Sequence, residues 1–307
     1  MRIAVTGGAG FIGSHVVDAY VAAGHEVLVI DNLSTGRREY VHPQARLVVM
    51  DIADPAVEEL LRRERIEVLN HHAAQIDLRY SVTHPEEDAR QNILGSLRLY
   101  EAACRAGVRR IIFASTGGAI YGEQREFPAE ETHPTAPIAP YGVSKLAAEK
   151  YLECYARLYG IEAVILRYTN VYGPRQNPKG EAGVVAIFLG KLLAGEPPLI
   201  YGDGEQTRDY IYVEDVARAN LAALEPAASG VYNCSTGVET SVNALLRMLQ
   251  QLTGRWIAPQ YCAARPGELR RSVCSPERLR RELGWCPQVP LPEGLFRTLQ
   301  ALQAQAQ

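Results

Sequence analysis

The sequence has no apolar run that approaches the roughly 20 residues of a membrane-spanning helix. Its six cysteines form no Cys-x-x-Cys pair and show no zinc-like spacing, and its seven histidines form no metal-binding motif. Its charged residues form no block, and the net charge of −3 argues against a nucleic-acid surface. These absences predict reduced cysteines, no metal site, no membrane or nucleic-acid partner, and a cytoplasmic location.

The chain is long enough for a large hydrophobic core. It has 307 residues, 47% of them hydrophobic, which suits one two-lobed unit or two domains. Short apolar runs alternate with segments of helical spacing, so we expect strands at 3–5, 27–30, 47–50, 68–69, 111–114 and 164–166, and helices at 87–106 and 141–158. This alternation predicts an α/β fold with a doubly wound parallel sheet. After about residue 170, glycines and prolines separate shorter elements, which indicates a smaller lobe.

A glycine-rich turn follows the first expected strand. Gly7, Gly8, Gly10 and Gly13 precede or overlap a run with helical spacing that begins at Phe11. Gly8 and Gly10 allow a tight turn and close backbone approach, and Gly13 lets the helix pack against the sheet. The helix N-terminus then offers free N–H groups to a pyrophosphate. The turn predicts a dinucleotide-binding site, with a purely structural glycine turn as the alternative.

An acidic residue ends the second expected strand. Asp31 follows the apolar run 27–30, at the position where the ribose of a bound dinucleotide is expected. Its carboxylate can accept hydrogen bonds from both ribose hydroxyls, and it repels a 2′-phosphate. The sequence therefore predicts NAD as the cofactor, while Arg37 and Arg38 keep NADP open as the alternative.

Tyr141 and Lys145 form a second pattern. Pro140 starts an expected helix, and the four-residue spacing puts both side chains on one face. A free phenol has a pKa near 10, so about three units of depression, roughly 4 kcal/mol, are needed before its phenolate serves as a base near neutrality. A nearby ammonium and an oxidised nicotinamide both favour the phenolate. The pair predicts a catalytic base, Tyr141, assisted by Lys145, with an ordinary helix surface as the alternative.

Polar side chains follow two further expected strands. Ser115 and Thr116 come after the run 111–114, and active-site groups of open α/β sheets lie at such carboxyl ends. Thr116 can bond a substrate hydroxyl and relay its proton to Tyr141, with Ser115 as the nearby stand-in. His71 and His72 are adjacent on a strand, so they point to opposite faces, in the core or beside the cofactor.

The order of these residues resembles the extended short-chain dehydrogenase/reductase family, and within it the UDP-glucose 4-epimerase group. The likeness covers nearly the whole chain. Its marks are the segments 6–13, 31–33, 51–52, 73–75, 120–122, 167–174, 201–204, 208–210 and 265–268, together with Asn92, Thr116, Tyr141 and Lys145.

The resemblance implies a set of NAD-binding residues. They are Gly7, Gly10, Phe11, Ile12, Gly13, Asp31, Asn32, Asp51, Ile52, Ala73, Ala74, Gln75, Asn92, Tyr141, Lys145 and Tyr168. Within this set, Asp51 and Ile52 hold the adenine. The segment 73–75 lines the pyrophosphate and nicotinamide ribose, and Tyr168 lies near the nicotinamide.

The resemblance also implies a nucleotide-sugar site in the smaller lobe. Its residues are Thr116, Asn170, Val185, Tyr201, Arg208, Arg265 and Ser272. Asn170 and the two arginines are diphosphate ligands, for which pairing of the arginines with carboxylates is the alternative. Tyr201 stacks on uracil. Ser272 is small and lies beside the sugar, which suggests room for N-acetylated UDP-hexosamines, unless it merely faces solvent or a loop.

The implied activity is inversion at C4 of a UDP-hexose such as UDP-glucose or UDP-galactose, through transient oxidation to a 4-keto sugar by tightly bound NAD, with Tyr141 as base. Relatives that dehydrate or decarboxylate carry an acid after the catalytic threonine, where this chain has Gly117 and Gly118. The alternatives are a uronate 4-epimerase, 4-reductase or dehydratase of nucleotide sugars, and a non-catalytic dinucleotide sensor.

The same resemblance implies the domain organisation, the substrate and the oligomeric state. Residues 1–169 are expected to form the NAD-binding Rossmann domain, with a return segment near 211–235, and residues 170–307 mainly the nucleotide-sugar lobe. A UDP-sugar is the expected substrate, and galactose metabolism the expected setting. A homodimer is expected through the helices at 87–106 and 141–158, whose apolar positions serve either the core or a partner: Ile93, Leu97, Leu146 and Tyr155.

Overall fold

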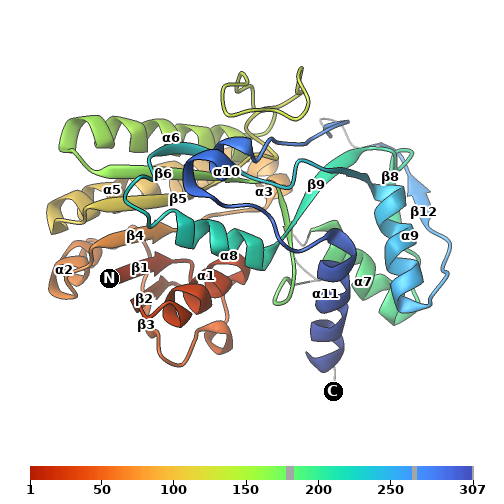
Figure 1. The fold of residues 1–307 in the computed structure, drawn as a ribbon, viewed down its shortest axis with the longest axis horizontal. Coiled ribbons are helices and arrows are strands. Elements are labelled where there is room, and N and C mark those ends of the chain that lie inside the picture. The colour runs from red at the N-terminus through yellow and green to blue at the C-terminus, as the bar shows by residue number, and fades with distance from the viewer. Residues whose placement is uncertain (178–182, 265–267, 306–307) are drawn as a thin grey trace.

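Seven parallel strands form the central sheet, in the order β10-β6-β5-β4-β1-β2-β3 (Figure 1). The computed structural model describes residues 1–177, 183–264 and 268–305. The strands are β1 (Arg2–Thr6), β2 (Glu26–Asp31), β3 (Arg46–Val49), β4 (Val68–His71), β5 (Arg110–Thr116), β6 (Glu162–Tyr168) and β10 (Gly230–Cys234). The predicted parallel sheet and its six predicted strands are confirmed. Because all seven strands run in one direction, their carboxyl ends meet at one edge.

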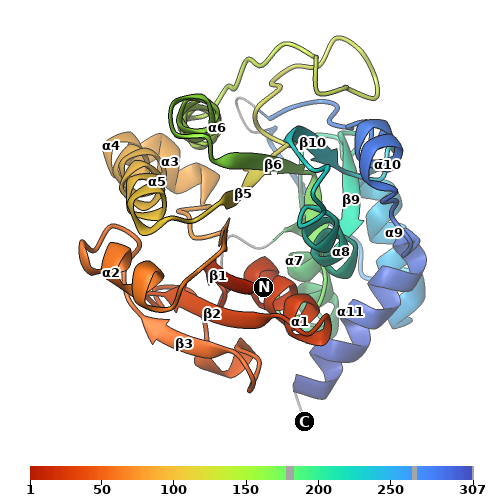
Figure 2. The same cartoon turned by 60° about the vertical axis from the view of Figure 1, so that its left-hand side comes forward.

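Helices cover both faces of this sheet (Figure 2). One face carries α2 (Ala56–Arg63), α5 (Gly95–Ala106) and α6 (Pro140–Tyr159), and the other carries α1 (Phe11–Ala22) and α8 (Val213–Ala222). Alternate residues of β1 reach the two cores, since Ile3 and Val5 pack on the side of α1 while Ala4 packs on the side of α5. The sheet is therefore buried on both faces, as expected for a parallel sheet.

The segment before α5 is more broken than the sequence predicts. It contains α3 (Leu78–Thr83), α4 (Pro85–Ala89) and a π-helical turn, η2 (Arg90–Leu94), which runs directly into α5. The single regular helix predicted at 87–106 is thus helical throughout but widened at 90–94. A short 3₁₀ turn, η1 (Arg38–Tyr40), follows β2.

A smaller lobe lies beside the sheet (Figure 1). It has a three-stranded sheet in the order β11-β9-β7 and a parallel pair, β12-β8. Its elements are β7 (Asn170–Tyr172), α7 (Val184–Ala194), β8 (Leu199–Tyr201), β9 (Thr207–Tyr212), β11 (Glu239–Ser241), α9 (Val242–Thr253), β12 (Gln260–Cys262) and α11 (Leu291–Gln305). A separate core forms between α7, α9 and α11, around Phe188, Leu245 and Leu295.

The chain passes back from the smaller lobe to the central sheet. After β9 it enters α8 and β10, and β10 pairs in parallel with β6 at the edge of the sheet. Later, α10 (Glu277–Leu283) packs beside β10 and buries Leu279 in the core that contains α1. The domain limits at 169 and 170, with a return near 211–235, stay a prediction. No helix of the described ranges combines the length and the apolar character that crossing a membrane requires.

Candidate active site

The turn between β1 and α1 brings backbone close to backbone. Gly7 has a φ of +70°, and a Cβ there would lie 2.7 Å from the backbone nitrogen of Ala73. A Cβ at Gly13 would overlap the carbonyl oxygen of Gly7. The backbone N–H of Gly10 donates to that same oxygen at 3.0 Å. A side chain at Gly13 would therefore push α1 away from the end of β1, and one at Gly7 would push against the backbone of Ala73.

The N-terminus of α1 has no side-chain cap. Gly10 is the N-cap residue, and the first turn contains no acidic side chain. The first N–H groups of a helix have no partner within the helix, and they carry a partial positive charge. Here this end of the helix lines a cavity of about 600 Å³, to which Gly10, Phe11 and Ile12 contribute. The arrangement can bind an anionic phosphate group.

Asp31 is fixed at the end of β2. Its carboxylate accepts hydrogen bonds from the backbone N–H of Ala9 at 3.0 Å and of Leu33 at 2.8 Å, and it lines the same cavity. Neither Arg37 nor Arg38 is a lining residue. Arg37 instead lies 3.6 Å from Glu39 in an ion pair. The cavity thus presents a negative charge where a 2′-phosphate would need a positive one, which favours NAD over NADP.

The remaining predicted cofactor residues gather around this cavity, with one exception. The lining includes Asn32, Asp51, Ile52, Ala73, Ala74, Gln75 and Tyr168. Asn92 lies behind the wall. Its Oδ1 accepts from the backbone N–H of Gln75 at 2.9 Å, and its Nδ2 donates to the carbonyl of Gln75 at 2.9 Å. Asn92 therefore fixes the backbone of the cavity wall at Gln75.

Tyr141 and Lys145 line the cavity from α6. Pro140 occupies the first turn of α6, and the backbone N–H of Tyr141 donates to Ser81 Oγ at 3.2 Å, so the start of the helix is held. Lys145 is buried, and its Nζ lies 4.2 Å from the centre of the Phe113 ring. Tyr141 and Lys145 therefore line the same cavity as the glycine turn.

Burial shifts both groups away from the charged forms that catalysis needs. It lowers the pKa of Lys145 to about 7, although Glu149 and Asp88 act in the opposite direction. Burial also raises the pKa of Tyr141 well above its usual range, and the negative charge of Asp88 raises it further. The phenolate consequently needs additional positive charge in the cavity.

Two hydroxyl residues end β5 near this cavity. Ser115 lines it, and Ser115 Oγ is buried without a hydrogen-bond partner among the described residues. Thr116 is half-buried and is not a lining residue. A Cβ built at Gly118 would lie 3.9 Å from Thr116 Oγ1 and 3.8 Å from Asn170 Oδ1. Thr116 thus lies on the side of the site that faces the smaller lobe.

Gly117 has little room for a side chain. Its N–H donates to the carbonyl of Tyr168 at 2.7 Å, and a Cβ there would lie 3.0 Å from Cys274 Sγ. Cys274 is buried and its Sγ donates toward the carbonyl of Gly117 at 3.7 Å. A side chain directly after Thr116 would therefore require a small shift of Cys274 Sγ.

The two adjacent histidines separate as predicted. His71 lies in the core, with Thr6 Oγ1 at 2.8 Å from Nδ1 and Ser96 Oγ at 3.0 Å from Nε2. His72 lines the cavity and stacks against Tyr168, whose hydroxyl lies 3.0 Å from His72 Nε2. Burial lowers the pKa of His72 to about 3, so its imidazole is neutral and positions the Tyr168 hydroxyl without adding charge.

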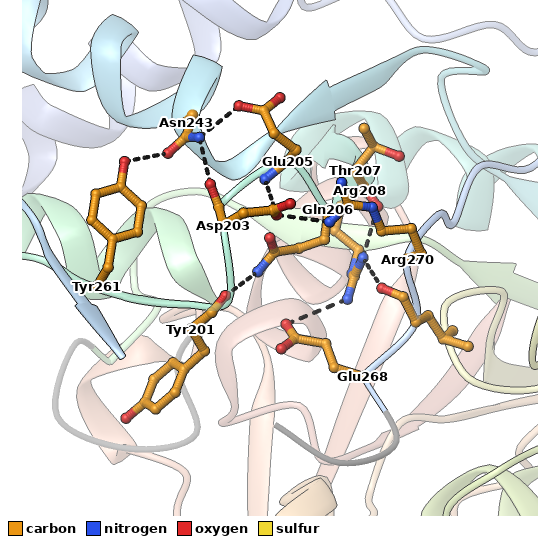
Figure 3. Close-up of polar contacts among 11 residues, drawn as sticks. Tyr201, Asp203, Glu205, Gln206, Thr207, Arg208, Asn243, Tyr261, Glu268 and Arg270 are labelled. Carbon is orange, nitrogen blue, oxygen red and sulfur yellow. Dashed lines mark hydrogen bonds and ion pairs between the residues drawn. The ribbon is translucent and has the colours of Figure 1, made fainter. Parts of the chain in front are cut away.

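The smaller lobe carries a polar cluster around Arg208 (Figure 3). Arg208 donates to the carbonyl oxygens of Thr207 and Leu269, both at 2.8 Å, and lies 3.6 Å from Glu268 in an ion pair. Gln206 Nε2 donates to the carbonyl of Tyr201 at 2.9 Å. The Tyr201 ring points away from the other labelled side chains in Figure 3. Arg208 therefore has a carboxylate partner in the protein. This is the alternative to phosphate binding that the sequence left open.

The other predicted substrate residues lie in different surroundings. Val185 is buried in the core of the smaller lobe, and Asn170 begins β7. Ser272 is also buried, which excludes a solvent-facing position, and the next N–H, that of Val273, donates to Gln124 at 3.0 Å. Arg265 lies outside the described residues. The substrate roles of these residues stay predictions.

Sequence reasoning missed Asp88 and Ser144. Asp88 is fully buried on α4, and its carboxylate accepts a hydrogen bond from Ser144 on α6 at 2.6 Å. The available signal was local, because Asp88 precedes Asn92 by one helical turn and Ser144 stands between Tyr141 and Lys145. The sequence gives no sign that the two segments meet.

The fold and this cavity define a dinucleotide-dependent enzyme with the tyrosine and lysine of a short-chain dehydrogenase/reductase. A family model described as the NAD dependent epimerase/dehydratase family matches residues 3–235. The chain belongs to this family.

Individual relatives match over the full length of the chain. A UDP-glucose 4-epimerase of Mycolicibacterium smegmatis is 44% identical, with 100% of both chains covered. A crystal structure of a UDP-glucose 4-epimerase of Thermotoga maritima with UDP-glucose has a TM-score of 0.98 at 47% identity, and covers 100% of both chains. A Thermus thermophilus UDP-glucose 4-epimerase in complex with NAD has a TM-score of 0.94 at 45% identity, with 99% of both chains covered. The predicted resemblance to this epimerase group is confirmed.

Proposed function

We propose that this protein is a UDP-glucose 4-epimerase, which interconverts UDP-glucose and UDP-galactose with tightly bound NAD. One observation carries the proposal: Tyr141 and Lys145 line the same cavity as the glycine turn and Asp31. Full-length similarity to epimerases from Mycolicibacterium smegmatis and Thermotoga maritima supports it.

The residues of the cavity fit NAD. The uncapped N-terminus of α1 lines the cavity and suits a pyrophosphate. Asp31 offers carboxylate oxygens to a ribose diol. When bound, NAD takes up a hydride from C4 of the sugar and returns it. The chain itself handles the proton.

Tyr141 is the proton acceptor in this proposal. It takes the proton of the sugar 4-hydroxyl, either directly or through Thr116, and later gives it back. Burial opposes the phenolate in the protein alone, so Tyr141 becomes a base when the Lys145 ammonium is joined by positive charge in the cavity. The Tyr141 phenolate would therefore form only when NAD is bound in the cavity.

Inversion requires that the nucleotide stays bound while the flat keto sugar turns over. Asn170 and Arg208 are proposed to hold the diphosphate from the smaller lobe, with Tyr201 against the uracil ring. Arg208 would then exchange its ion pair with Glu268 for phosphate oxygens, which suits its forked guanidinium. The C4 centre can be reduced from either face once the sugar has rotated.

The geometry after Thr116 argues against elimination. Dehydration or decarboxylation of a 4-keto sugar calls for a further acid or base beside the catalytic hydroxyl. Positions 117 and 118 are both glycine, so neither supplies such a group, and a Cβ at 117 would already lie 3.0 Å from Cys274 Sγ. Return of the hydride to the sugar is therefore the favoured outcome.

The direct test is conversion of UDP-galactose by the purified protein without added NAD. We expect UDP-glucose at unchanged mass, identified by chromatography and mass spectrometry, and a loss of at least about 100-fold in kcat for Tyr141→Phe, because general acid–base catalysis contributes on this scale. Loss of water or carbon dioxide, or a requirement for stoichiometric NAD, would contradict the proposal.

Three wider expectations belong to the same proposal. Galactose metabolism is the proposed setting, and a cytoplasmic location stays a prediction. A homodimer is proposed through α5 and α6, since Leu97, Leu146 and Tyr155 on these helices are only half-buried in the single chain. The exposed Val143 and Tyr151 extend this apolar surface along α6.

A further inference from the structure

The Asp88 carboxylate joins three side chains from separate parts of the site. Its Oδ1 accepts from Gln75 Nε2 at 2.9 Å and from Asn92 Nδ2 at 3.0 Å. Its Oδ2 accepts from Ser144 Oγ at 2.6 Å. Asp88 is completely buried, so these partners replace the water that a carboxylate would otherwise bind.

Each donor is tied to a functional part of the cavity. Gln75 belongs to the cavity wall. Asn92 Oδ1 accepts from the backbone N–H of Gln75, which fixes the orientation of the amide and makes Nδ2 the donor to Asp88. Ser144 precedes Lys145 and follows Tyr141 by three residues on α6. One carboxylate therefore connects the cavity wall to the turn that carries both catalytic side chains.

We propose that Asp88 is a positioning residue for the epimerase reaction, holding the turn of α6 that carries Tyr141 and Lys145 against the cofactor-binding wall at 73–77. The inference rests on the function proposed above. It extends that function by assigning a role to a residue that does not touch the substrate or the cofactor.

The widened turn η2 supports this role. It begins two residues after Asp88 and contains Asn92. A π-helical turn interrupts the regular hydrogen-bond ladder, and such turns recur at functional sites. Here α4, η2 and α6 pack against one another, and Asn92 reaches both the Gln75 backbone and Asp88. The irregular turn thus places one amide between two fixed partners.

Charge gives Asp88 a second effect on the same residues. The other buried carboxylate nearby, Glu149, bonds Arg167 at 3.0 and 2.7 Å, so a guanidinium balances it. The donors to Asp88 are neutral amides and a hydroxyl. Glu149 still raises the pKa of Lys145, whereas the negative charge of Asp88 raises the pKa of both Lys145 and Tyr141.

The other titratable groups around the pair have their own partners. At the end of β4 and directly after it, His71 and His72 are neutral because burial lowers their pKa values, and Lys145 lowers them further. Asp77 caps the backbone N–H of Tyr80 on α3 at 2.8 Å. Glu87 pairs with Arg90 at 3.5 Å. A shift in the pH profile of an Asp88 variant can therefore be assigned to the lost charge of Asp88, since these other groups keep their own partners.

The test is Asp88→Asn, which removes the charge with little change in shape. Loss of a nearby negative charge lowers the pKa of any neighbouring group, so both limbs of the pH profile of kcat should move to lower pH, by about one unit. The value of kcat at its optimum should fall at least about tenfold, since a small misplacement of catalytic groups is costly. A wild-type kcat would overturn the positioning role, and limbs that stay in place would overturn the electrostatic effect.

Two further variants separate charge from position. Ser144→Ala keeps the charge but cuts the link to α6, so kcat should fall at least about fivefold with the limbs of the profile unmoved; wild-type kcat would overturn the positioning role. Glu86→Gln is the matched control, because it removes an exposed carboxylate from the same helix. Its profile should match that of the wild type. If Asp88→Asn does not fold, the Ser144→Ala result decides.

A spectroscopic readout keeps this inference distinct from the proposed function. In the NAD-loaded protein, the ultraviolet absorbance of tyrosinate is titrated, with Tyr141→Phe as the blank for the other 15 of the 16 tyrosines. The Tyr141 transition should occur at lower pH in Asp88→Asn, whatever substrate the enzyme uses. An unmoved transition would overturn the electrostatic role even in an active epimerase. A moved transition in a protein that does not convert UDP-galactose would overturn only the proposed function.

Discussion

Glu149 and Arg167 form a buried ion pair near the site. Both side chains are almost completely buried, and the guanidinium donates to both carboxylate oxygens, at 3.0 and 2.7 Å. Arg167 also donates to the hydroxyl of Tyr121 at 2.9 Å. Removing one partner leaves the other charge buried without compensation. We expect Glu149→Gln to lower the free energy of unfolding by about 3 kcal/mol, measured by urea denaturation.

An exposed ion pair on the same helix provides the control. Lys150 and Glu153 lie 3.0 Å apart near the surface of α6. Such pairs contribute little, so Glu153→Gln should lower the free energy of unfolding by less than about 0.5 kcal/mol. Equal losses of unfolding free energy in Glu149→Gln and Glu153→Gln would contradict the claim that burial makes the Glu149 pair more stabilising.

At the scale of elements, the close contact of β1 with α1 controls cofactor retention. Gly13→Ala introduces a methyl group that overlaps the carbonyl oxygen of Gly7, so the first turn of α1 must shift away from the pyrophosphate position. We expect at least about tenfold weaker retention of NAD, measured as the cofactor released from the purified protein by denaturation.

Gly24 at the other end of α1 separates this effect from simple loss of stability. It has a φ of +81°, but no atom lies within 4 Å of a Cβ built there. Gly24→Ala should therefore lower the unfolding temperature through backbone strain, while NAD retention stays at the wild-type level. Loss of NAD in both variants would contradict a specific role for the Gly7–Gly13 contact.

Regular elements were predictable where the chain repeats a local pattern. The strand at 111–114 reads as an apolar run, and Pro140 marks the start of α6. The π turn at 90–94 was not predictable, because its apolar spacing still fits a regular helix. Within this turn, Asn92 bonds the backbone of Gln75, which is 17 residues away in the sequence. Tertiary contacts of this kind leave no periodic signal.

At the scale of the whole molecule, the central sheet and the presence of a smaller lobe could be predicted, whereas the short strands of that lobe could not. Parallel strands buried on both faces are continuous apolar runs in the sequence. The glycine turn and Asp31 mark the ends of the first two strands, β1 and β2. In the smaller lobe, β7, β8, β11 and β12 have only three residues each, too few to show a period of two. The link between Asp88 and Ser144 spans 56 residues, so it appears only once the chain is folded.

The central claim is that hydride leaves C4 and returns to it within one loaded site. The most direct measurement uses UDP-galactose with deuterium at C4, incubated in ordinary water with the purified protein and no added NAD. The proposed function predicts UDP-glucose that retains the deuterium at C4, because the hydride never exchanges with solvent. Product that has lost the label to water, or that carries it at another carbon, would contradict it.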